Sequence, residues 1–315
     1  MIVTLTTNPS LDRTLDLTEL RRGEVNRALH SSLEAGGKGV NVSRALFAHG
    51  AHTAAVLPAG GPSGRLLAIL LADADVSFTP VPIGGVLRVN TTVVEPDGTT
   101  TKLNETGPTL DAPEALALLA ATDDLVKDAD WLAVCGSLAP GLPSDFYATA
   151  VRRAHTYGRP VALDVSGDAL AEALPAGPDL ITPNRVELAE LVGSDLTTIG
   201  QVRGAAEELV RSGIPTVIVS LGRDGALLVT DHLALHARAI PVRPISTVGA
   251  GDSLLAGVLH SLQQGADVRT ALSTGVRWGT AAVRLPGSQV PSPADVADID
   301  VTVTTCTNED LALAD

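Results

Sequence analysis

At 315 residues the chain can bury a large core, which suits one α/β domain or one domain with an appendage. Hydrophobic residues make up 45% of the chain but aromatic residues only 2%, so the core must be built from Ala, Leu and Val. The formal net charge is -14, and no run of Lys or Arg could form a patch for nucleic acid or an anionic membrane, so neither partner is expected.

Short runs rich in β-branched residues alternate along the chain with longer segments of helical spacing. The predicted strands begin with IVTL and continue, in chain order, with TAAVL, WLAVC, PVALDV, DLITPN and TVIVSLG. Helices are predicted over 39–49 and 62–74, and another begins near 249. This βαβ rhythm predicts an α/β fold whose mostly parallel sheet is covered by helices on both faces. Such sheets bind ligands at the carboxyl ends of their strands.

Two segments depart from this rhythm. Residues 13–35 alternate like strands and lack a helix signal, while residues 88–104 predict two strands joined across Asp97-Gly98, a favoured hairpin turn. Together they could form a small sheet beside the main one. No internal repeat or low-complexity linker divides the chain, so residues 1–315 are expected to form a single domain.

The cysteines and the N-terminus give no sign of a metal, redox or membrane role. Cys135 and Cys306 are far apart and match no metal or redox spacing, and Cys135 is predicted to be a buried strand residue. The opening MIVTLTTNPSLD has no basic n-region, and no later segment reaches about 18 uninterrupted apolar residues. We therefore expect a cytoplasmic protein.

A glycine cluster, EAGGKGVNVSRAL at residues 34–46, leads into the first helical segment. It is not the P-loop motif G-x-x-x-x-G-K-[ST], because Gly39 follows Lys38 and no glycine lies five positions before Gly37. Unpaired N–H groups at a helix start would still favour an anion, which glycines allow to approach closely. A plain tight turn is the alternative interpretation.

A second stretch, STVGAGDSLLAG at residues 246–257, also combines small residues with a helix start. Gly249, Ala250 and Gly251 would present backbone N–H groups to an anion with nothing in the way. Asp252 follows in the first turn, where the helix dipole alone would favour a carboxylate. Its place beside an anion hole suggests a base that takes a hydroxyl proton while the backbone stabilises a phosphoryl group in transfer.

These two stretches resemble a known family. STVGAGDSLLAG is similar to the C-terminal signature of the ribokinase-like sugar kinases, and AGGKGVNVSRAL to the N-terminal signature of their phosphofructokinase-B branch. They occur in the expected order, and the similarity covers nearly the whole chain. The resemblance implies a three-layer sandwich with a mostly parallel central sheet and a small β lid near 13–35 and 88–104. It also implies that Asp252 is the catalytic base and that 249–251 form the anion hole.

The resemblance further implies which residues contact the acceptor sugar. NPSLD is similar to a sugar-contacting segment, which makes Asp12 an acceptor for sugar hydroxyls; a turn aspartate after Pro9 is the alternative. The other expected contacts are Gly37 and Asn41 in the glycine motif, Lys38 for a phosphate already on the sugar, Arg88 and Asn90 in a lid segment, and Gly136 and Ser137 in a G-S-L turn. In this interpretation the glycine cluster holds the anion of the sugar, not that of the nucleotide.

The nucleotide side is implied by weaker similarities. TPNRVEL matches the pattern N-x-x-E, so Asn184 and Glu187 are expected to organise Mg²⁺ and the ATP phosphates through water, although Val186 replaces a basic residue found in some members. SLGRDGAL resembles the segment that lines the nucleotide site, with Ser220, Gly222 and Gly225. RWGTAAVRLPGS resembles the adenine-side helix only loosely, and only Gly279 is carried over from it.

The resemblance thus implies an ATP- and Mg²⁺-dependent kinase that converts fructose 1-phosphate to fructose 1,6-bisphosphate. Phosphorylation of fructose 6-phosphate or tagatose 6-phosphate remains open. A kinase of an unphosphorylated sugar or nucleoside would leave Lys38 as an uncompensated buried cation, which would be costly. A non-catalytic sugar-phosphate-binding regulator is the rival outside the enzymes, and the retained Asp252 argues against it. A lid with an apolar face would be better covered by a second copy, which predicts a homodimer through the lid.

Overall fold

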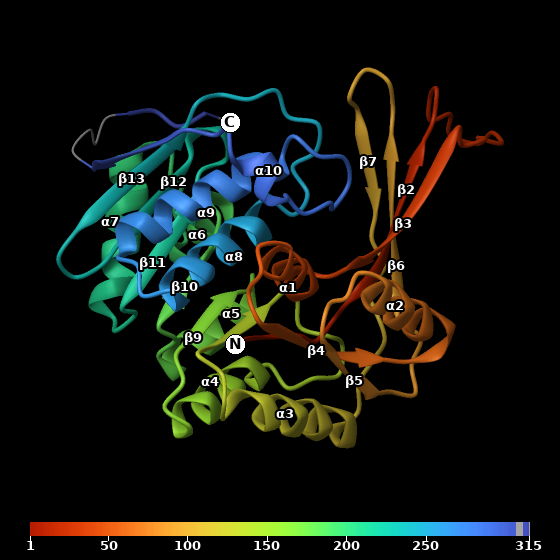
Figure 1. Ribbon diagram of the computed structural model, residues 1–315, viewed down its shortest axis with the longest axis horizontal. Helices are drawn as coiled ribbons and strands as arrows, with labels where there is room; N and C mark the ends of the chain where they lie inside the picture. The colour runs from red at the N-terminus through yellow and green to blue at the C-terminus, as the bar shows by residue number, and fades with distance from the viewer. Residues whose placement is uncertain (307–310, 315) are drawn as a thin grey trace.

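A ten-stranded sheet forms the centre of the fold in residues 1–306 and 311–314, the part of the chain that the computed structural model describes. Parallel pairing joins β5, β4, β1, β8, β9, β10 and β11, in that spatial order. Antiparallel pairings add β12, β13 and β14 at one edge. In spatial order they are β14 (Val301–Thr305), β13 (Ala234–Ala239), β12 (Ala226–Val229), β11 (Thr216–Ser220), β10 (Leu180–Ile181), β9 (Val161–Asp164), β8 (Trp131–Cys135), β1 (Ile2–Thr6), β4 (Thr53–Ala59) and β5 (Phe78–Pro82) (Figure 1).

Helices cover both faces of this sheet because side chains alternate along each strand. In β1, Val3 and Leu5 pack in one buried cluster with α3–α7, whereas Ile2 packs in another with α1, α8 and α9. The first layer contains α3 (Ala112–Val126), α4 (Phe146–Thr156), α5 (Asp168–Ala173), α6 (Arg185–Val192) and α7 (Ile199–Arg211). The second contains α1 (Lys38–Ala48), α2 (Gly61–Asp73), α8 (Ala250–Gln263) and α9 (Val268–Ala282), with the short α10 (Pro293–Val296) beside α9. The predicted three-layer α/β arrangement is confirmed.

The segments that depart from the βαβ rhythm form a second sheet. Its order is β3 (His30–Gly36), β2 (Ser10–Asp16), β6 (Arg88–Val94) and β7 (Thr100–Leu103). Figure 1 shows this sheet standing out from one end of the large sheet. The β6–β7 hairpin turns over Pro96–Gly98, with Gly98 at φ 91° and a hydrogen bond of 2.9 Å from its N–H to the carbonyl of Glu95. The predicted hairpin is therefore confirmed, as a turn of three residues.

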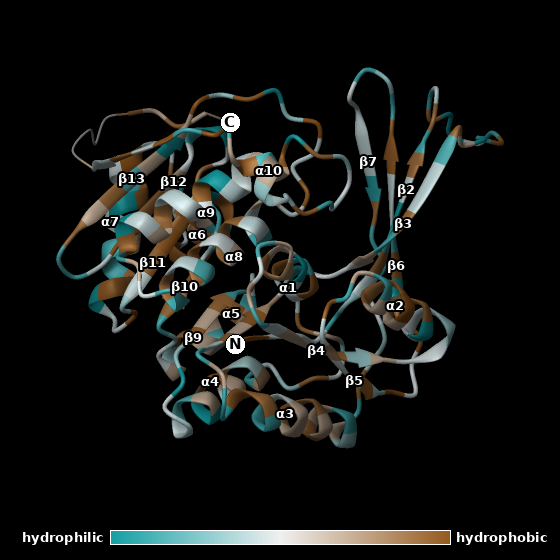
Figure 2. Ribbon diagram, in the orientation of Figure 1, coloured by the Kyte–Doolittle hydropathy of each residue, from teal (hydrophilic) through white to brown (hydrophobic). Residues whose placement is uncertain are grey.

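Hydropathy follows the layers. The central strands are mainly hydrophobic and the tip of the β6–β7 hairpin is hydrophilic (Figure 2). Cys135 is fully buried at the end of β8, as predicted, and Cys306 is also buried. Among the helices of the described residues, none has the length and apolar character needed to cross a membrane.

Candidate functional site

The predicted site residues gather at one edge of the large sheet. Because the strands of the large sheet other than β12, β13 and β14 are parallel, their carboxyl ends lie at the same edge. Three of these parallel strands, β1, β9 and β11, end at Thr6, Asp164 and Ser220. Helices α1, α6 and α8 begin at 38, 185 and 250. The candidate site therefore lies where a parallel α/β sheet binds its ligands.

Asp252 is a buried carboxylate in the first turn of α8. Its Oδ2 atom accepts a hydrogen bond of 2.8 Å from Nδ2 of Asn41 in α1. Burial, followed by the negative charge of Asp164, raises the pKa of Asp252 to about 7, although Lys38 and Asn41 act in the opposite direction. A carboxyl group with such a pKa can exchange a proton near neutral pH, which a surface carboxylate that only complements a helix dipole does not do.

The start of α8 leaves backbone N–H groups available. Gly249 is the N-cap in the left-handed region at φ 77°, and no side chain caps the helix. Apart from the adjoining residues of the same turn, a Cβ atom on Gly249 or Gly251 would meet no atom of the described residues within 4 Å. The N–H of Ser253 already bonds to the carbonyl of Gly249 at 2.9 Å, so the free N–H groups are those that precede it. Such groups, together with the helix dipole, can hold an anion beside Asp252.

The ammonium group of Lys38 lies between two carboxylates. Its Nζ atom is 3.0 Å from Oδ1 of Asp164 and 3.8 Å from Oε1 of Glu187. Burial opposes the charged form, but the negative charges of Asp164, Glu187 and Asp252 outweigh it and raise the pKa of Lys38 above its usual value. The prediction placed Lys38 at the phosphate of the sugar. In the structure Lys38 is already paired with Asp164, and it lies next to Glu187, a residue that was predicted to organise Mg²⁺ and ATP.

Asp164 is absent from the predicted site, although it is the partner that holds Lys38. It is buried at the end of β9, and its Oδ2 atom has no hydrogen-bond partner among the described residues. An unpaired buried carboxylate oxygen is costly unless a ligand completes it. Its position could have been found from the sequence, because Asp164 is the carboxylate at the end of the predicted strand PVALDV and ligands bind at the carboxyl ends of such strands.

The N-terminal glycine cluster passes close to other groups. A Cβ atom on Gly36 would overlap the carboxylate of Asp12, and one on Gly39 would overlap Oγ1 of Thr6. Gly37 adopts φ 114°, where side chains are strained. Tight packing therefore accounts for these glycines, in agreement with the tight-turn interpretation. It also brings Lys38 and Asn41 to the edge of the sheet.

Asp12 and Asn90 lie side by side in the small sheet. They are register partners on the parallel strands β2 and β6, and Asn90 Nδ2 donates to Asp12 Oδ1 at 3.1 Å. The same oxygen accepts a hydrogen bond of 2.6 Å from Ser10 Oγ. Asp12 is thus a strand residue, and the alternative of a turn aspartate is wrong. The structure brings together Asp12, predicted to accept from sugar hydroxyls, and Asn90, predicted to belong to the lid segment that closes over the sugar.

Arg88 and Ser137 reach a common residue, Asn8. Arg88 Nη2 donates to the carbonyl of Asn8 at 2.8 Å, and Nδ2 of Asn8 donates to Oγ of Ser137 at 3.3 Å. Nε of Arg88 and Oδ1 of Asn8 are buried without a partner among the described residues. Asn8 was not predicted, although it stands in the quoted segment NPSLD. The unpaired Nε–H of Arg88 is a donor suited to an oxyanion such as a phosphate, whereas Oδ1 of Asn8 can only accept a hydrogen bond.

Tyr147 supports the Gly136–Ser137 turn from α4. Its buried hydroxyl lies 2.7 Å from Oγ1 of Thr7 and 3.2 Å from the carbonyl oxygens of Gly136 and Ser137. Gly136 has φ 90°, which favours glycine. The turn is therefore held in a fixed position next to Asn8.

The pattern N-x-x-E forms a helix cap. Oδ1 of Asn184 accepts from the N–H of Glu187 at 2.9 Å, and Oε2 of Glu187 accepts from the N–H of Asn184 at 2.8 Å. This reciprocal pair is a capping box, a local structural role that the pattern alone did not separate from a role at the nucleotide. It leaves Oε1 of Glu187 directed to Lys38.

The other residues predicted for the nucleotide lie in two places. Ser220 ends β11 and forms a bridge with Asn184, while Gly222 and Gly225 bound the turn into β12. A Cβ atom on Gly225 would overlap the carbonyl of Ala237, so packing of the sheet already requires this glycine. Gly279 lies in α9, where a Cβ atom would come within 3.0 Å of the carbonyl of Ala250. Gly279 therefore lets α9 approach the start of α8.

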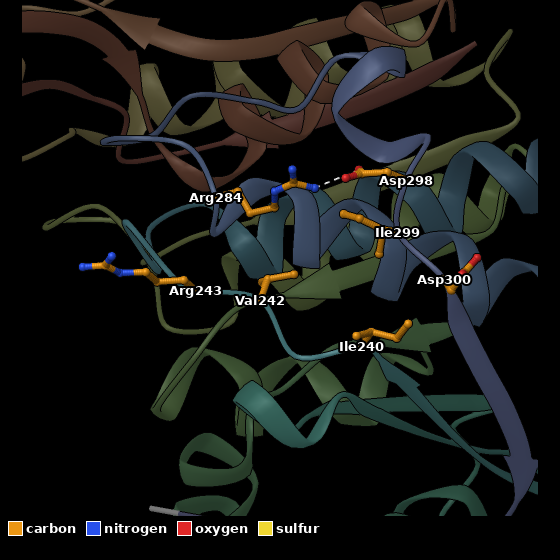
Figure 3. Close-up of a pocket in the computed structure, with 7 residues that line it drawn as sticks. All are labelled: Ile240, Val242, Arg243, Arg284, Asp298, Ile299 and Asp300. Carbon is orange, nitrogen blue, oxygen red and sulfur yellow. Dashed lines mark hydrogen bonds and ion pairs between the residues drawn. The ribbon is translucent and has the colours of Figure 1, made fainter.

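A cavity of about 330 Å³ lies apart from all these residues. It lies between the segment that follows β13, Arg284 after α9 and residues 298–300 before β14, and none of the predicted site residues lines it. Figure 3 shows Arg284 paired with Asp298, at 2.8 Å, and the guanidinium of Arg243 pointing away from the other labelled side chains. The cavity gives no support to the predicted nucleotide contacts.

The residues fit a magnesium ion held mainly by water and phosphate. Within residues 1–306 and 311–314, no group of three or more His, Cys, Asp or Glu side chains could hold a metal directly. Mg²⁺ usually takes one or two carboxylates and completes its shell with water and substrate phosphates. Glu187 and the unpaired Oδ2 of Asp164 provide carboxylate oxygens on either side of Lys38.

Comparison with known proteins gives one consistent result. The model of the pfkB family carbohydrate kinases matches residues 5–295. A 1-phosphofructokinase of Rhodobacter capsulatus is 37% identical over 308 residues, which cover 96% of each chain. An ATP-dependent 6-phosphofructokinase isozyme 2 of Mycobacterium tuberculosis is 35% identical over 94% of this chain and 87% of that protein.

Solved structures agree with the fold. Phosphofructokinase-2 of Escherichia coli, in complex with substrates and products, superimposes with a TM-score of 0.89 at 34% identity, covering 94% of this chain and 96% of that one. A ribokinase of Thermotoga maritima gives a TM-score of 0.73 over 94% of this chain and 97% of that one, at 21% identity. The ribokinase-like fold expected from the sequence is confirmed.

Proposed function

The chain belongs to the pfkB family of carbohydrate kinases, and from this membership we propose that it transfers the γ-phosphoryl group of ATP to fructose 1-phosphate. The product would be fructose 1,6-bisphosphate. The observation that carries the proposal is the buried Asp252, hydrogen-bonded to Asn41 at 2.8 Å, in the first turn of a helix whose leading N–H groups are free.

Asp252 acts as the general base in this proposal. In its ionised form it takes the proton of the primary hydroxyl as that oxygen attacks the γ-phosphorus, and the bond to the leaving ADP breaks in line. The free N–H groups of 249–251 would stabilise the charge on the phosphoryl oxygens during transfer. Burial of Asp252 supports this role because it keeps the proton affinity of the carboxylate near that needed at neutral pH.

The acceptor would lie between the small sheet and the large one. Asp12, Asn90, Gly37 and Asn41 would orient the ring hydroxyls, and Arg88 with Ser137 would hold the phosphate already on the sugar. The unpaired Nε of Arg88 supports this assignment. Such a charge-assisted contact typically contributes about 1.5–3 kcal/mol.

Lys38 would then serve the transferred phosphoryl group and not the phosphate of the sugar. Its place between Asp164 and Glu187, close enough to Asp252 to affect its pKa, supports this revision. Asn184 and Glu187, with Ser220, Gly222 and Gly225, would contact ATP, and Gly279 would shape the adenine side. Mg²⁺, when bound, neutralises charge on the phosphates; Glu187 would hold it through water.

The alternatives within the family concern the acceptor. A fructose ring turned end over end nearly preserves the distance from its phosphate to the attacking hydroxyl, so fructose 6-phosphate and tagatose 6-phosphate fit the same groups. The 1-phosphate is preferred because the relatives at 37% identity are named 1-phosphofructokinase. The 6-phosphofructokinase relative of Mycobacterium tuberculosis, at 35%, supports the alternative.

An acceptor panel tests the proposal. Fructose 1-phosphate, fructose 6-phosphate and tagatose 6-phosphate are assayed at equal, sub-saturating concentrations with saturating Mg-ATP, with free fructose as the control. We expect kcat/KM for the 1-phosphate to be at least about tenfold higher, which is about 1.4 kcal/mol of discrimination. Faster turnover of a 6-phosphate would overturn the named substrate. ATP binding without turnover of any acceptor would favour the non-catalytic regulator.

We also propose a homodimer through the small sheet, in the cytoplasm. Val25, Leu29 and Leu103, all on the small sheet or its loops, are 71%, 74% and 60% exposed, which favours a covering partner. Sedimentation of the wild type and of a Leu29→Asp, Leu103→Asp double variant tests the dimer. A monomeric wild type would contradict it.

A further inference from the structure

Arg44 joins three segments next to the candidate site. Its Nη1 atom donates to the carbonyl of Ala35 at 3.2 Å, to the carbonyl of Ser288 at 3.3 Å and towards Oδ1 of Asn41 at 3.4 Å. Its Nη2 lies 4.0 Å from the carboxylate of Glu34. These partners belong to the lid strand β3, the start of α1 and the loop that follows α9. A mostly buried guanidinium with so many contacts fixes the segments relative to one another.

The contact with Asn41 determines which way that amide points. A guanidinium can only donate hydrogen bonds, so the oxygen of the Asn41 amide must face Arg44. The NH₂ group then faces Asp252, to which it donates at 2.8 Å. Arg44 therefore acts on the proposed base through Asn41, without touching the reacting atoms.

Glu34 closes the same arrangement from the lid. Its Oε2 atom accepts hydrogen bonds from Oγ of Ser288, at 2.8 Å, and from the N–H of Ser288, at 3.3 Å. Ser288 is 2% exposed and the side chain of Glu34 21% exposed, so these bonds are partly shielded from water. A carboxylate that accepts two hydrogen bonds from one residue fixes the loop after α9 against β3.

The loop is connected in turn to the anion hole. The carbonyl of Gly287 accepts a hydrogen bond of 2.9 Å from Oγ of Ser246, and the same hydroxyl accepts one of 3.2 Å from the N–H of Val248. Val248 directly precedes Gly249, the N-cap of α8. A displacement of Ser288 would therefore reach the free N–H groups at 249–251.

We propose that Glu34, Arg44 and Ser288 form a junction that positions the base and the anion hole for phosphoryl transfer. All three are positioning residues: Arg44 acts through Asn41 on Asp252, and Glu34 with Ser288 acts through Ser246 on the start of α8. Since Glu34 lies on β3, the junction also ties the geometry of the reaction to the position of the lid. The inference rests on the proposed phosphoryl transfer, because it assigns a role to these residues in that reaction.

The test is a double-mutant cycle on kcat with the best acceptor of the panel. Ser288→Ala and Glu34→Ala should each lower kcat about tenfold, as expected for a lost charge-assisted hydrogen bond, with KM for the acceptor within about threefold of the wild type. Because the two residues share one contact, kcat of the double variant should fall no more than about 20-fold, which is twice the larger single reduction and well below the roughly 100-fold expected if the two reductions multiplied. Glu34→Gln keeps an acceptor oxygen and should recover at least about a third of kcat.

Controls separate this role from a general loss of structure. Glu24→Ala removes a carboxylate that pairs with Arg21 on the surface of the same lid, and its kcat should equal that of the wild type. Ser288→Ala removes a single oxygen atom, so this variant alone tests the junction if Glu34→Ala fails to fold. A kcat of Ser288→Ala within about twofold of the wild type, or losses that multiply in the double variant, overturns the junction. A wild type that phosphorylates no acceptor overturns the proposed function and the junction together.

Discussion

The two glycine-rich turns of this chain differ in the space around their glycines. In the N-terminal cluster, a Cβ atom on Gly36 or Gly39 would overlap Asp12 or Thr6. At the start of α8, a Cβ atom on Gly249 or Gly251 would meet nothing within 4 Å in the described part of the chain beyond the adjoining residues of its own turn. Filled surroundings account for Gly36 and Gly39, whereas the surroundings of Gly249 and Gly251 are open and only the left-handed backbone of Gly249 favours glycine there.

This difference indicates where the ligand charge belongs. A crowded turn fixes the backbone and brings Lys38 and Asn41 into place, but it offers little room of its own. An open turn at a helix start keeps its N–H groups available and can accept an anion. The proposed chemistry is therefore centred on the C-terminal turn, and the N-terminal turn supplies side chains to it.

The largest expected effect comes from the residue next to the open turn. Asp252→Asn should lower kcat by about 10²–10⁴, the usual range for a lost general base, with the fold and ATP binding nearly intact. Steady-state kinetics, ATP titration and thermal unfolding measure the three quantities. A variant that keeps more than about a third of kcat would reduce Asp252 to a residue that complements the helix dipole.

The next largest effects distinguish the role of Lys38, the cation of the crowded turn, from that of Arg88, the cation of the lid. Arg88→Ala should raise KM for the sugar phosphate by about 10- to 100-fold, the equivalent of about 1.5–3 kcal/mol, because it removes the proposed phosphate contact. Lys38→Ala should instead lower kcat or raise KM for ATP, since its ammonium lies between Asp164 and Glu187. A selective rise in the sugar-phosphate KM of Lys38→Ala would return the lysine to the acceptor.

The third prediction compares the glycines directly. Gly39→Ala should lower the free energy of unfolding by about 1–3 kcal/mol, because the new methyl group would overlap Thr6 in a filled site. Gly251→Ala has open space and a helical backbone, so the unfolding free energy should stay the same or rise by about 0.5–1 kcal/mol, while activity falls. Chemical denaturation and kcat/KM give both results. A fully active Gly251→Ala would show that no ligand approaches the start of α8.

The sequence predicts those features that depend on neighbouring residues. The βαβ order, a hairpin turn at Asp97-Gly98 and a helix start near 249 all follow from local spacing, and the structure has the turn over 96–98 and the helix from 250. The pairing of Lys38 with Asp164 does not, because it joins residues far apart along the chain that only the register of β1, β8 and β9 brings together. For the same reason, packing of α9 on α8 accounts for Gly279 in a way that a linear motif could not indicate.

A fourth prediction uses the pH dependence of the base. The pKa of Asp252 is raised to about 7 by burial and by Asp164, and only the ionised form accepts a proton, so kcat should fall as the pH drops through about 7. Asp164→Asn removes a negative charge that favours the protonated form, so the acid limb of kcat should move to lower pH. The measured quantity is the apparent pKa of the acid limb in the pH profile of kcat, which can be determined even if Asp164→Asn has a lower maximal kcat. An unchanged limb would mean that Asp252 does not control it.

The smallest effect is expected at α6, where one pattern combines a cap with a proposed contact to ATP. Asn184→Ala removes the side chain that accepts from the N–H of Glu187, so the free energy of unfolding should fall by about 1 kcal/mol. Asn184→Ser restores a capping oxygen and should recover most of that stability, but its shorter side chain would not reach a nucleotide. If Asn184 also organises the ATP phosphates, kcat falls in both variants, whereas a residue that only caps leaves kcat of the serine variant unchanged. Urea denaturation together with kcat at saturating Mg-ATP separates the two roles, and an alanine variant of unchanged stability would contradict the capping box.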